Sequence, residues 1–118
     1  MQLDDLRKTA VDALDSLKAV DVKVLDVSEI SSFTDLMIIA TGTSTRQVKA
    51  LADCVTEKCK AAGVRPLGVE GERESEWILV DLGDVVVHIM NPGTRDFYQL
   101  EKLWSLGERS NNRSTAKR

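Results

Sequence analysis

The alternation of apolar and polar positions is clearest over residues 77–90. Two runs rich in β-branched residues flank Gly83-Asp84, and a two-residue loop of this type favours a β-hairpin. Side chains alternate between the two faces of a strand, so a loop that pairs Leu82 with Val85 places an entirely apolar set on one face. We expect this set to lie in the core: Ile78, Val80, Leu82, Val85, Val87 and Ile89.

The opposite face of the predicted hairpin is neither clearly polar nor clearly apolar. We call it the mixed face, and its members are Trp77, Leu79, Asp81, Val86, His88 and Met90. If helices cover only the other side of the sheet, the mixed face has the composition of a partner-binding surface. If helices cover both sides, the same residues form a second buried layer whose polar groups are satisfied internally.

Three segments have the spacing of helices. Residues 3–18 carry apolar side chains three and four positions apart, which predicts an amphipathic helix. Ser44 and Gln47 form a capping box for a second helix that ends at Gly63. Its expected inward stripe is Val48, Leu51, Ala52, Val55, Cys59 and Ala62.

The third predicted helix begins after Asn91-Pro92-Gly93, with Thr94 as its cap. Its expected buried stripe is Phe97, Leu100 and Leu103 or Trp104. Arg95, Tyr98 and Lys102 share another face of the same helix.

Strands are predicted at residues 22–27, 36–40 and 67–70 in addition to the hairpin. The sequence therefore indicates an α/β fold with a mixed sheet of about five strands and helices packed on it. Residues 1–104 are expected to form one domain. Residues 105–118 contain few apolar side chains, which predicts a disordered basic tail.

The charge of the chain disfavours DNA as a direct partner. The net charge is −3, and residues 105–118 hold four basic residues against Glu108, so the remainder carries −6. An acidic body gains nothing from phosphate neutralisation but suits a basic protein, although acidity also serves solubility alone. No apolar run reaches the length of a membrane span and no signal peptide is recognisable, so we expect a cytoplasmic protein without membrane contact.

The residues that could support catalysis or metal binding are sparse. Cys54, Cys59 and the single histidine lack zinc-site spacing, and we expect both cysteines to be apolar fillers. The turn at residues 41–44 is the one place for a phosphate, but it lacks a P-loop pattern and is expected to be an ordinary helix cap. Asp81 and Asp84 cannot share a strand face to hold Mg²⁺. No catalytic residue, cofactor or metal is predicted.

Four blocks of the sequence together resemble one protein family. They are TDLMIIATGTSTRQ (34–47), GVEG (68–71), WILVDLGDVVVH (77–88) and RDFYQLEKLW (95–104). In order and spacing they resemble the ribosomal silencing factors, the Iojap or RsfS family. The resemblance implies a nucleotidyltransferase-like topology without demonstrated catalysis, and frequent homodimers. A nucleotide-binding or nucleotidyltransferase enzyme is the alternative that this likeness leaves open.

The same resemblance implies a function. Such a protein binds the large ribosomal subunit through its L-fourteen protein, blocks joining of the small subunit and represses translation. Trp77, Asp81, His88 and Tyr98 match the family's motifs, and with Leu79 and Met90 they are the expected partner-binding residues. His88 has a second interpretation, as a core histidine bonded to Asp81 across the strands.

Overall fold

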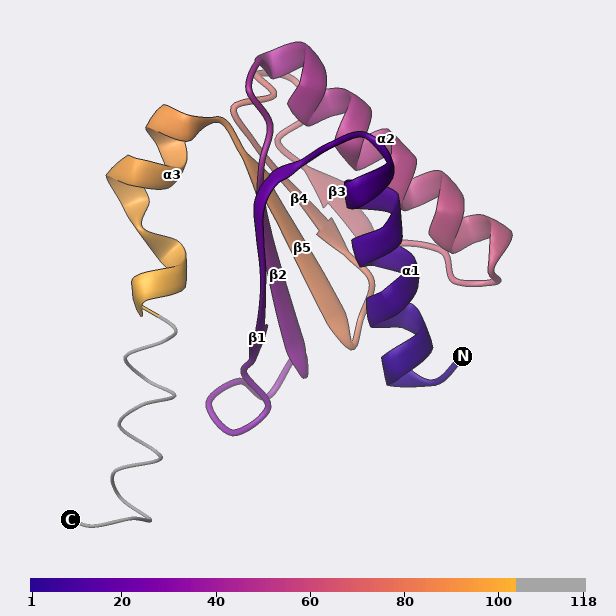
Figure 1. Ribbon diagram of the computed structural model, residues 1–118. Coiled ribbons are helices and arrows are strands. Elements are labelled where there is room, and N and C mark those ends of the chain that lie inside the picture. The colour runs from indigo at the N-terminus through magenta and orange to yellow at the C-terminus, as the bar shows by residue number, and fades with distance from the viewer. Residues whose placement is uncertain (104–118) are drawn as a thin grey trace, which may run out of the picture.

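The computed structural model describes residues 1–103 and contains one five-stranded sheet with helices on both sides (Figure 1). Helices α1 and α2 lie on one side of the sheet, and the short helix α3 lies on the other. In chain order the elements are α1 Leu3–Ser16, β1 Val20–Asp26, β2 Leu36–Thr41, α2 Thr45–Ala61, β3 Gly68–Glu70, β4 Trp77–Asp81, β5 Val85–Met90 and α3 Pro92–Tyr98. Trp104 and the predicted tail at residues 105–118 lie outside the described residues.

The sheet is mixed, as predicted. Its strand order is β1-β2-β5-β4-β3, in which β2 and β5 are parallel and every other pair is antiparallel. The hairpin has the predicted register, because Val80 lies opposite Val87 and the amide of Leu82 donates to the carbonyl of Val85 over 2.9 Å. Strand β2, which lies between β1 and the central strand β5, is buried on both faces.

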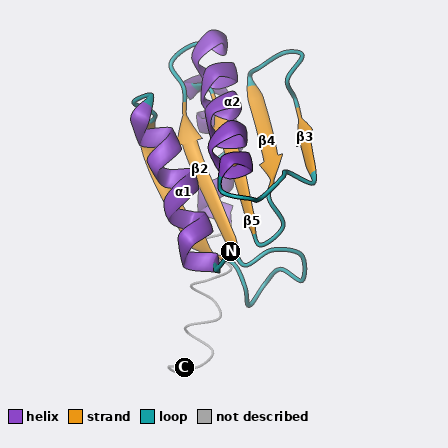
Figure 2. Cartoon of the chain, turned by 90° about the vertical axis from the view of Figure 1, so that its right-hand side faces the viewer, coloured by secondary structure: helices purple, strands orange, loops and turns teal. Residues whose placement is uncertain are grey.

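The main core lies between the sheet and the helix pair α1 and α2 (Figure 2). The apolar face of the hairpin is buried there together with Leu6 and Leu14 of α1. Five predicted stripe residues of α2 are buried too, whereas Ala62 is exposed because α2 ends one residue before it. No helix within residues 1–103 has the length and apolar character needed to cross a membrane.

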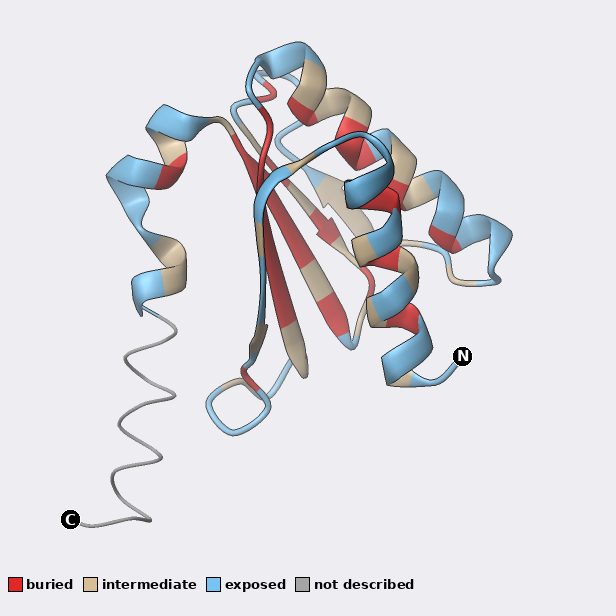
Figure 3. Ribbon diagram, in the orientation of Figure 1, coloured by how far each residue is buried: buried red, intermediate tan, exposed pale blue. Residues whose placement is uncertain are grey.

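A second and smaller cluster occupies the opposite side of the sheet. It consists of the buried residues Val27, Met37, Ile39 and Met90, with Leu25, Trp77 and Leu100 packed against them. The mixed face is therefore covered only in part, by α3 and the turn that follows it. Figure 3 shows the contrast between the buried sheet and the largely exposed α3.

The third helix differs from its prediction. Its cap is Asn91, whose Oδ1 accepts from the amide of Thr94 over 2.8 Å, rather than Thr94 itself. Gln99 adopts the left-handed conformation, with φ of 48°, and ends the helix after seven residues. This break removes the helical spacing that the predicted stripe required, so Phe97 and Leu103 are 79% and 67% exposed.

Candidate functional site

The hairpin turn holds Asp81 in place on the mixed face. The amide of Gly83 donates to Asp81 Oδ1 over 2.9 Å, an Asx-type turn that fixes the end of β4. Leu79 lies opposite His88 in the register, and Asp81 lies opposite Val86. Leu79 and Asp81 are both half-buried, so each keeps part of its side chain on the surface.

Trp77 and His88 form a hydrogen-bonded pair on this face. Trp77 Nε1 donates to His88 Nδ1 over 3.0 Å, so the neutral imidazole carries its proton on Nε2. His88 is only 6% exposed, and its burial lowers the pKa of the imidazole from 6.5 to about 4. His88 is thus a core histidine, but its partner is Trp77 and not Asp81, which corrects that part of the alternative interpretation.

Helix α3 brings Tyr98 against Trp77 and Phe97 against Tyr98. The ring of Tyr98 lies 4.9 Å from the ring of Trp77 at an interplanar angle of 52°. Phe97 meets Tyr98 edge to face, also with 4.9 Å between ring centroids. Trp77 is half-buried and Tyr98 is 56% exposed, so the stack leads from the second cluster out to the surface.

The six expected partner-binding residues therefore lie at different depths. Tyr98 is exposed, Trp77, Leu79 and Asp81 are half-buried, and His88 and Met90 are buried. Met90 is fully enclosed and lies beside Trp77, its partner across the two strands, in the second cluster. Phe97 joins the accessible group although its sequence pattern predicted burial.

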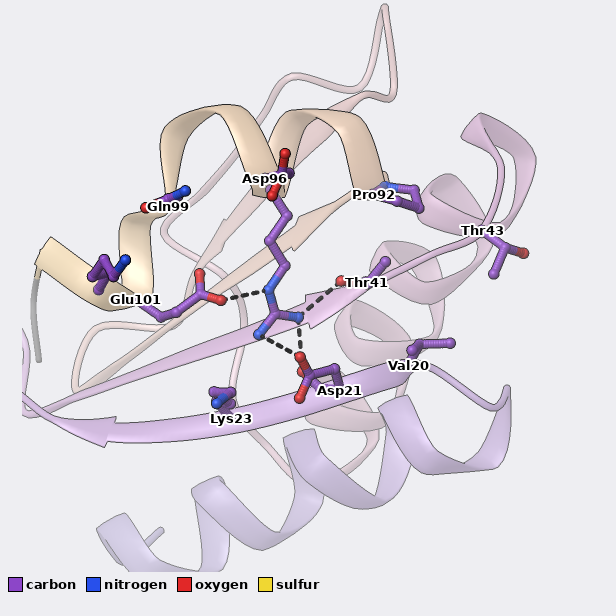
Figure 4. A pocket seen from close by; sticks show the side chains of 11 residues that line it. Val20, Asp21, Lys23, Thr41, Thr43, Pro92, Asp96, Gln99 and Glu101 are labelled. Atoms are coloured by element: carbon purple, nitrogen blue, oxygen red, sulfur yellow. Dashed lines mark hydrogen bonds and ion pairs between the residues drawn. The ribbon is translucent and has the colours of Figure 1, made fainter.

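Arg95 is more deeply buried than its place in the sequence pattern indicated. The spacing places it with Tyr98 and Lys102 on another face than the predicted buried stripe, but it is only 7% exposed. Its guanidinium lies against β1 and β2 and contacts Asp21, Thr41 and Glu101 (Figure 4). A charged arginine side chain is normally expected on the surface. The residues that bury Arg95 are distant from it in sequence, so no local pattern could indicate its burial.

A hollow of about 650 Å³ lies beside Arg95. Burial raises the pKa of the Glu101 carboxyl, but hydrogen bonds from the backbone and from Arg95, together with the positive charges of Arg95 and Lys23, outweigh burial and hold the pKa below its ordinary value. Both charge signs line the hollow, which is formed by Val20, Asp21, Lys23, Thr41, Thr43, Pro92, Arg95, Asp96, Gln99, Glu101 and Lys102.

The turn at residues 41–44 is occupied by helix capping. Ser44 Oγ accepts from the amide of Gln47 over 3.1 Å, and Gln47 Oε1 accepts from the amide and the hydroxyl of Thr43. A Cβ at Gly42 would lie 2.9 Å from the backbone nitrogen of Val48, so close packing against α2 explains the glycine. Within residues 1–103 no group of three or more His, Cys, Asp or Glu side chains is placed to hold a metal ion.

Comparison with known proteins gives consistent matches. The family model described as "Ribosomal silencing factor during starvation" matches residues 1–118. A ribosomal silencing factor of Haemophilus influenzae is 52% identical over 95 residues, which cover 80% of this chain and 93% of the relative. One of Chromobacterium violaceum is 50% identical over 104 residues, covering 88% and 85%.

More distant and structural matches agree with these. A mouse protein named for mitochondrial assembly of the ribosomal large subunit is 37% identical over 84% of this chain and 46% of its own length. A crystal structure of a Chromobacterium violaceum protein, 50% identical, superposes with a TM-score of 0.87 over 89% of this chain and 88% of its own. The whole-chain family match and the relatives at 50% and 52% identity show that this chain belongs to the ribosomal silencing factor family, RsfS.

Proposed function

We propose that this protein binds the large ribosomal subunit through the L-fourteen protein, blocks joining of the small subunit and so represses translation in the cytoplasm. Its membership of the silencing factor family supports this, as does the mouse relative whose name refers to assembly of the large subunit. The observation that carries the proposal is the Trp77–Tyr98 stack, which is partly exposed on the one side of the sheet that α1 and α2 leave open.

The stack has the properties of an interface anchor. Large aromatic side chains dominate binding energies when they become desolvated, and truncation of such an anchor costs about 2 kcal/mol or more. Trp77 is already held by its hydrogen bond to His88, so it loses little conformational freedom when a partner binds. Tyr98 and Phe97 supply apolar surface that becomes buried on binding.

Asp81 and Leu79 extend this surface along β4. Asp81 uses Oδ1 to hold the amide of Gly83, so Oδ2 is the atom with which it would accept hydrogen bonds from a basic partner. The acidic body, −6 without residues 105–118, favours encounter with a basic ribosomal protein through complementary charge. We propose Trp77, Leu79, Asp81 and Tyr98 as contact residues, with His88 and Met90 holding them from below.

We further propose that this function requires neither catalysis nor a cofactor. The turn that resembled a phosphate site serves as a helix cap, and Asp81 is engaged in its own turn. Ser44 Oγ and Asp81 Oδ1, which the alternative of a nucleotide-binding enzyme would call on, thus serve local structure.

The test is co-sedimentation with isolated large subunits, using Tyr98→Ala. Tyr98 suits this purpose better than Trp77, because Trp77 also packs on the second cluster and its removal would lower stability as well. We expect Tyr98→Ala to bind about 30-fold more weakly, which corresponds to about 2 kcal/mol. The matched control is Phe33→Ala, an aromatic that is 89% exposed in the loop between β1 and β2.

Binding by Phe33→Ala should equal that of the unmodified protein. If the unmodified protein does not pellet with large subunits, the proposal fails as a whole. If it pellets and Tyr98→Ala binds equally well, the partner surface lies elsewhere on the molecule.

A further inference from the structure

Apolar burial does little to hold α3 in position. The helix has seven residues, and Arg95 is its one buried residue. Its two large apolar side chains, Phe97 and Tyr98, are exposed. A helix this short is not stable by itself in water, so the attachment of α3 must come from specific contacts.

Arg95 supplies contacts to three separate segments. Its Nη1 donates to the backbone oxygen of Asp21 over 2.7 Å and to Thr41 Oγ1 over 2.8 Å. Its Nε donates to Glu101 Oε2 over 2.9 Å, and Nη2 lies 3.6 Å from Asp21 Oδ2. One side chain therefore links α3 to β1, to β2 and to the helical turn at residues 100–103. We call this set of contacts the Arg95 clasp.

The geometry points to Arg95 as a positioning residue: we propose that the clasp holds α3 against the sheet and thereby keeps Tyr98 stacked on Trp77. Arg95 and Tyr98 lie three positions apart on one short helix, so fixing the first also fixes the second. Arg95 itself is buried away from any partner and acts through Tyr98. The consequence for ribosome binding rests on the proposed function.

Two buried polar atoms of the clasp favour this positioning role over the alternative that the adjoining hollow is a ligand site. Arg95 Nη2 and Glu101 Oε1 have no hydrogen-bond partner within residues 1–103, and each exposes less than 1 Å². A molecule in the hollow could not reach atoms that water cannot reach. They mark how closely Arg95 and Glu101 pack, and the neighbouring atoms Arg95 Nε and Glu101 Oε2 form the hydrogen bond between charged groups that strengthens this contact.

The first experiment measures amide hydrogen exchange in Arg95→Gln. The amide of Gln99 donates to the carbonyl of Arg95 and reports directly on the end of α3. Loss of the clasp should speed its exchange at least about tenfold, while the central strands β2 and β5 keep their protection. Lys102→Gln, which removes a positive charge from the same region, is the control and should leave exchange in α3 unchanged.

The variant Arg95→Lys distinguishes the effect of the clasp contacts from the effect of the positive charge alone. Lysine keeps the positive charge but lacks the planar fork that reaches Thr41, Asp21 and Glu101 together. We expect exchange of the Gln99 amide in Arg95→Lys to remain faster than in the unmodified protein. Unchanged α3 exchange in both Arg95 variants would overturn the inference.

The second experiment is a double-mutant cycle on large-subunit binding with Arg95→Gln and Tyr98→Ala. If Arg95 acts through Tyr98, Arg95→Gln weakens binding and the double variant binds no more weakly than Tyr98→Ala alone. Additive losses, or full binding by Arg95→Gln while Tyr98→Ala is weakened, would overturn the inference. If Tyr98→Ala binds normally, the proposed surface is wrong. Amide hydrogen exchange in α3 alone then decides whether the Arg95 clasp holds α3 against the sheet.

Discussion

At the scale of single residues, the mixed face combines a buried histidine with a half-buried tryptophan. The hydrogen bond from Trp77 Nε1 requires His88 Nδ1 to be unprotonated. Protonation of His88 would place two N–H groups against each other and would charge a side chain that is almost enclosed. The geometry of the aromatic surface is thus coupled to the protonation state of one buried residue.

This coupling predicts an acid sensitivity that can be assigned to one group, because the chain has a single histidine. The unfolded chain takes up a proton near pH 6.5, whereas folded His88 does so only near pH 4. Between these values the unfolded state binds more protons, so the free energy of unfolding falls as the pH falls, by about 3 kcal/mol between pH 7 and pH 4. NMR titration should give a pKa near 4.

The matched variant for this prediction is His88→Asn, whose side-chain oxygen can still accept from Trp77. Carboxylates titrate in both proteins, so the difference between their stability curves isolates His88. An ordinary histidine pKa near 6.5, or equal pH dependence in the two proteins, would contradict the buried neutral imidazole.

At the scale of elements, the hairpin could be predicted from sequence and α3 could not. The register of β4 and β5 follows from a two-residue loop and a period of two, both of which are local signals. The position of α3 depends on Arg95 meeting Asp21 and Thr41, which are 74 and 54 residues away. It also depends on the left-handed Gln99, which no pattern in the neighbouring residues indicated.

Part of the candidate site could likewise be predicted from sequence, and part of it could not. Trp77, Leu79 and Asp81 were placed on one face correctly because strand alternation is local. The depth of Met90 and His88 could not be predicted, since it depends on which side of the sheet α3 covers. Phe97, which the pattern placed in the buried stripe, is exposed, whereas Arg95, which it placed outside that stripe, is buried. The reason is that the helix is shorter than its apolar spacing suggested.

The entry into β4 depends on a glycine at position 71. Gly71 has φ of +91°, and a Cβ there would collide with the carbonyl oxygen of Trp77. Gly63 has a similar φ of +96° but open space around it, which makes Gly63→Ala a matched control. We expect Gly63→Ala to cost about 1 kcal/mol for the backbone conformation alone, and Gly71→Ala at least about 2 kcal/mol more for the collision. Equal denaturant midpoints would contradict this.

At the scale of the whole molecule, one side of the sheet is closed and the other is partly open. Helices α1 and α2 bury the apolar face, and α1 contributes Leu3, Leu6, Ala10 and Leu14 to this packing, whereas Leu17 just after it is 40% exposed. The partly covered mixed face is the surface that we propose for association with other molecules.

The same surface predicts self-association. We expect a homodimer in which two mixed faces meet around a twofold axis, as is usual for identical subunits. Light scattering across a dilution series should show a mass that rises above 13.0 kDa at high concentration. Tyr98→Ala should shift the equilibrium towards the monomer and Phe33→Ala should not. A mass of 13.0 kDa at every concentration would exclude the dimer.

The most direct test of the central claim is the formation of joined ribosomes from purified subunits, followed by light scattering. Large subunits preincubated with the unmodified protein or with Phe33→Ala should join small subunits to a reduced extent. Tyr98→Ala, at a concentration just above the Kd of the unmodified protein, should permit joining close to that of untreated subunits, because we expect its binding to be about 30-fold weaker. Undiminished joining in the presence of saturating unmodified protein would contradict the account.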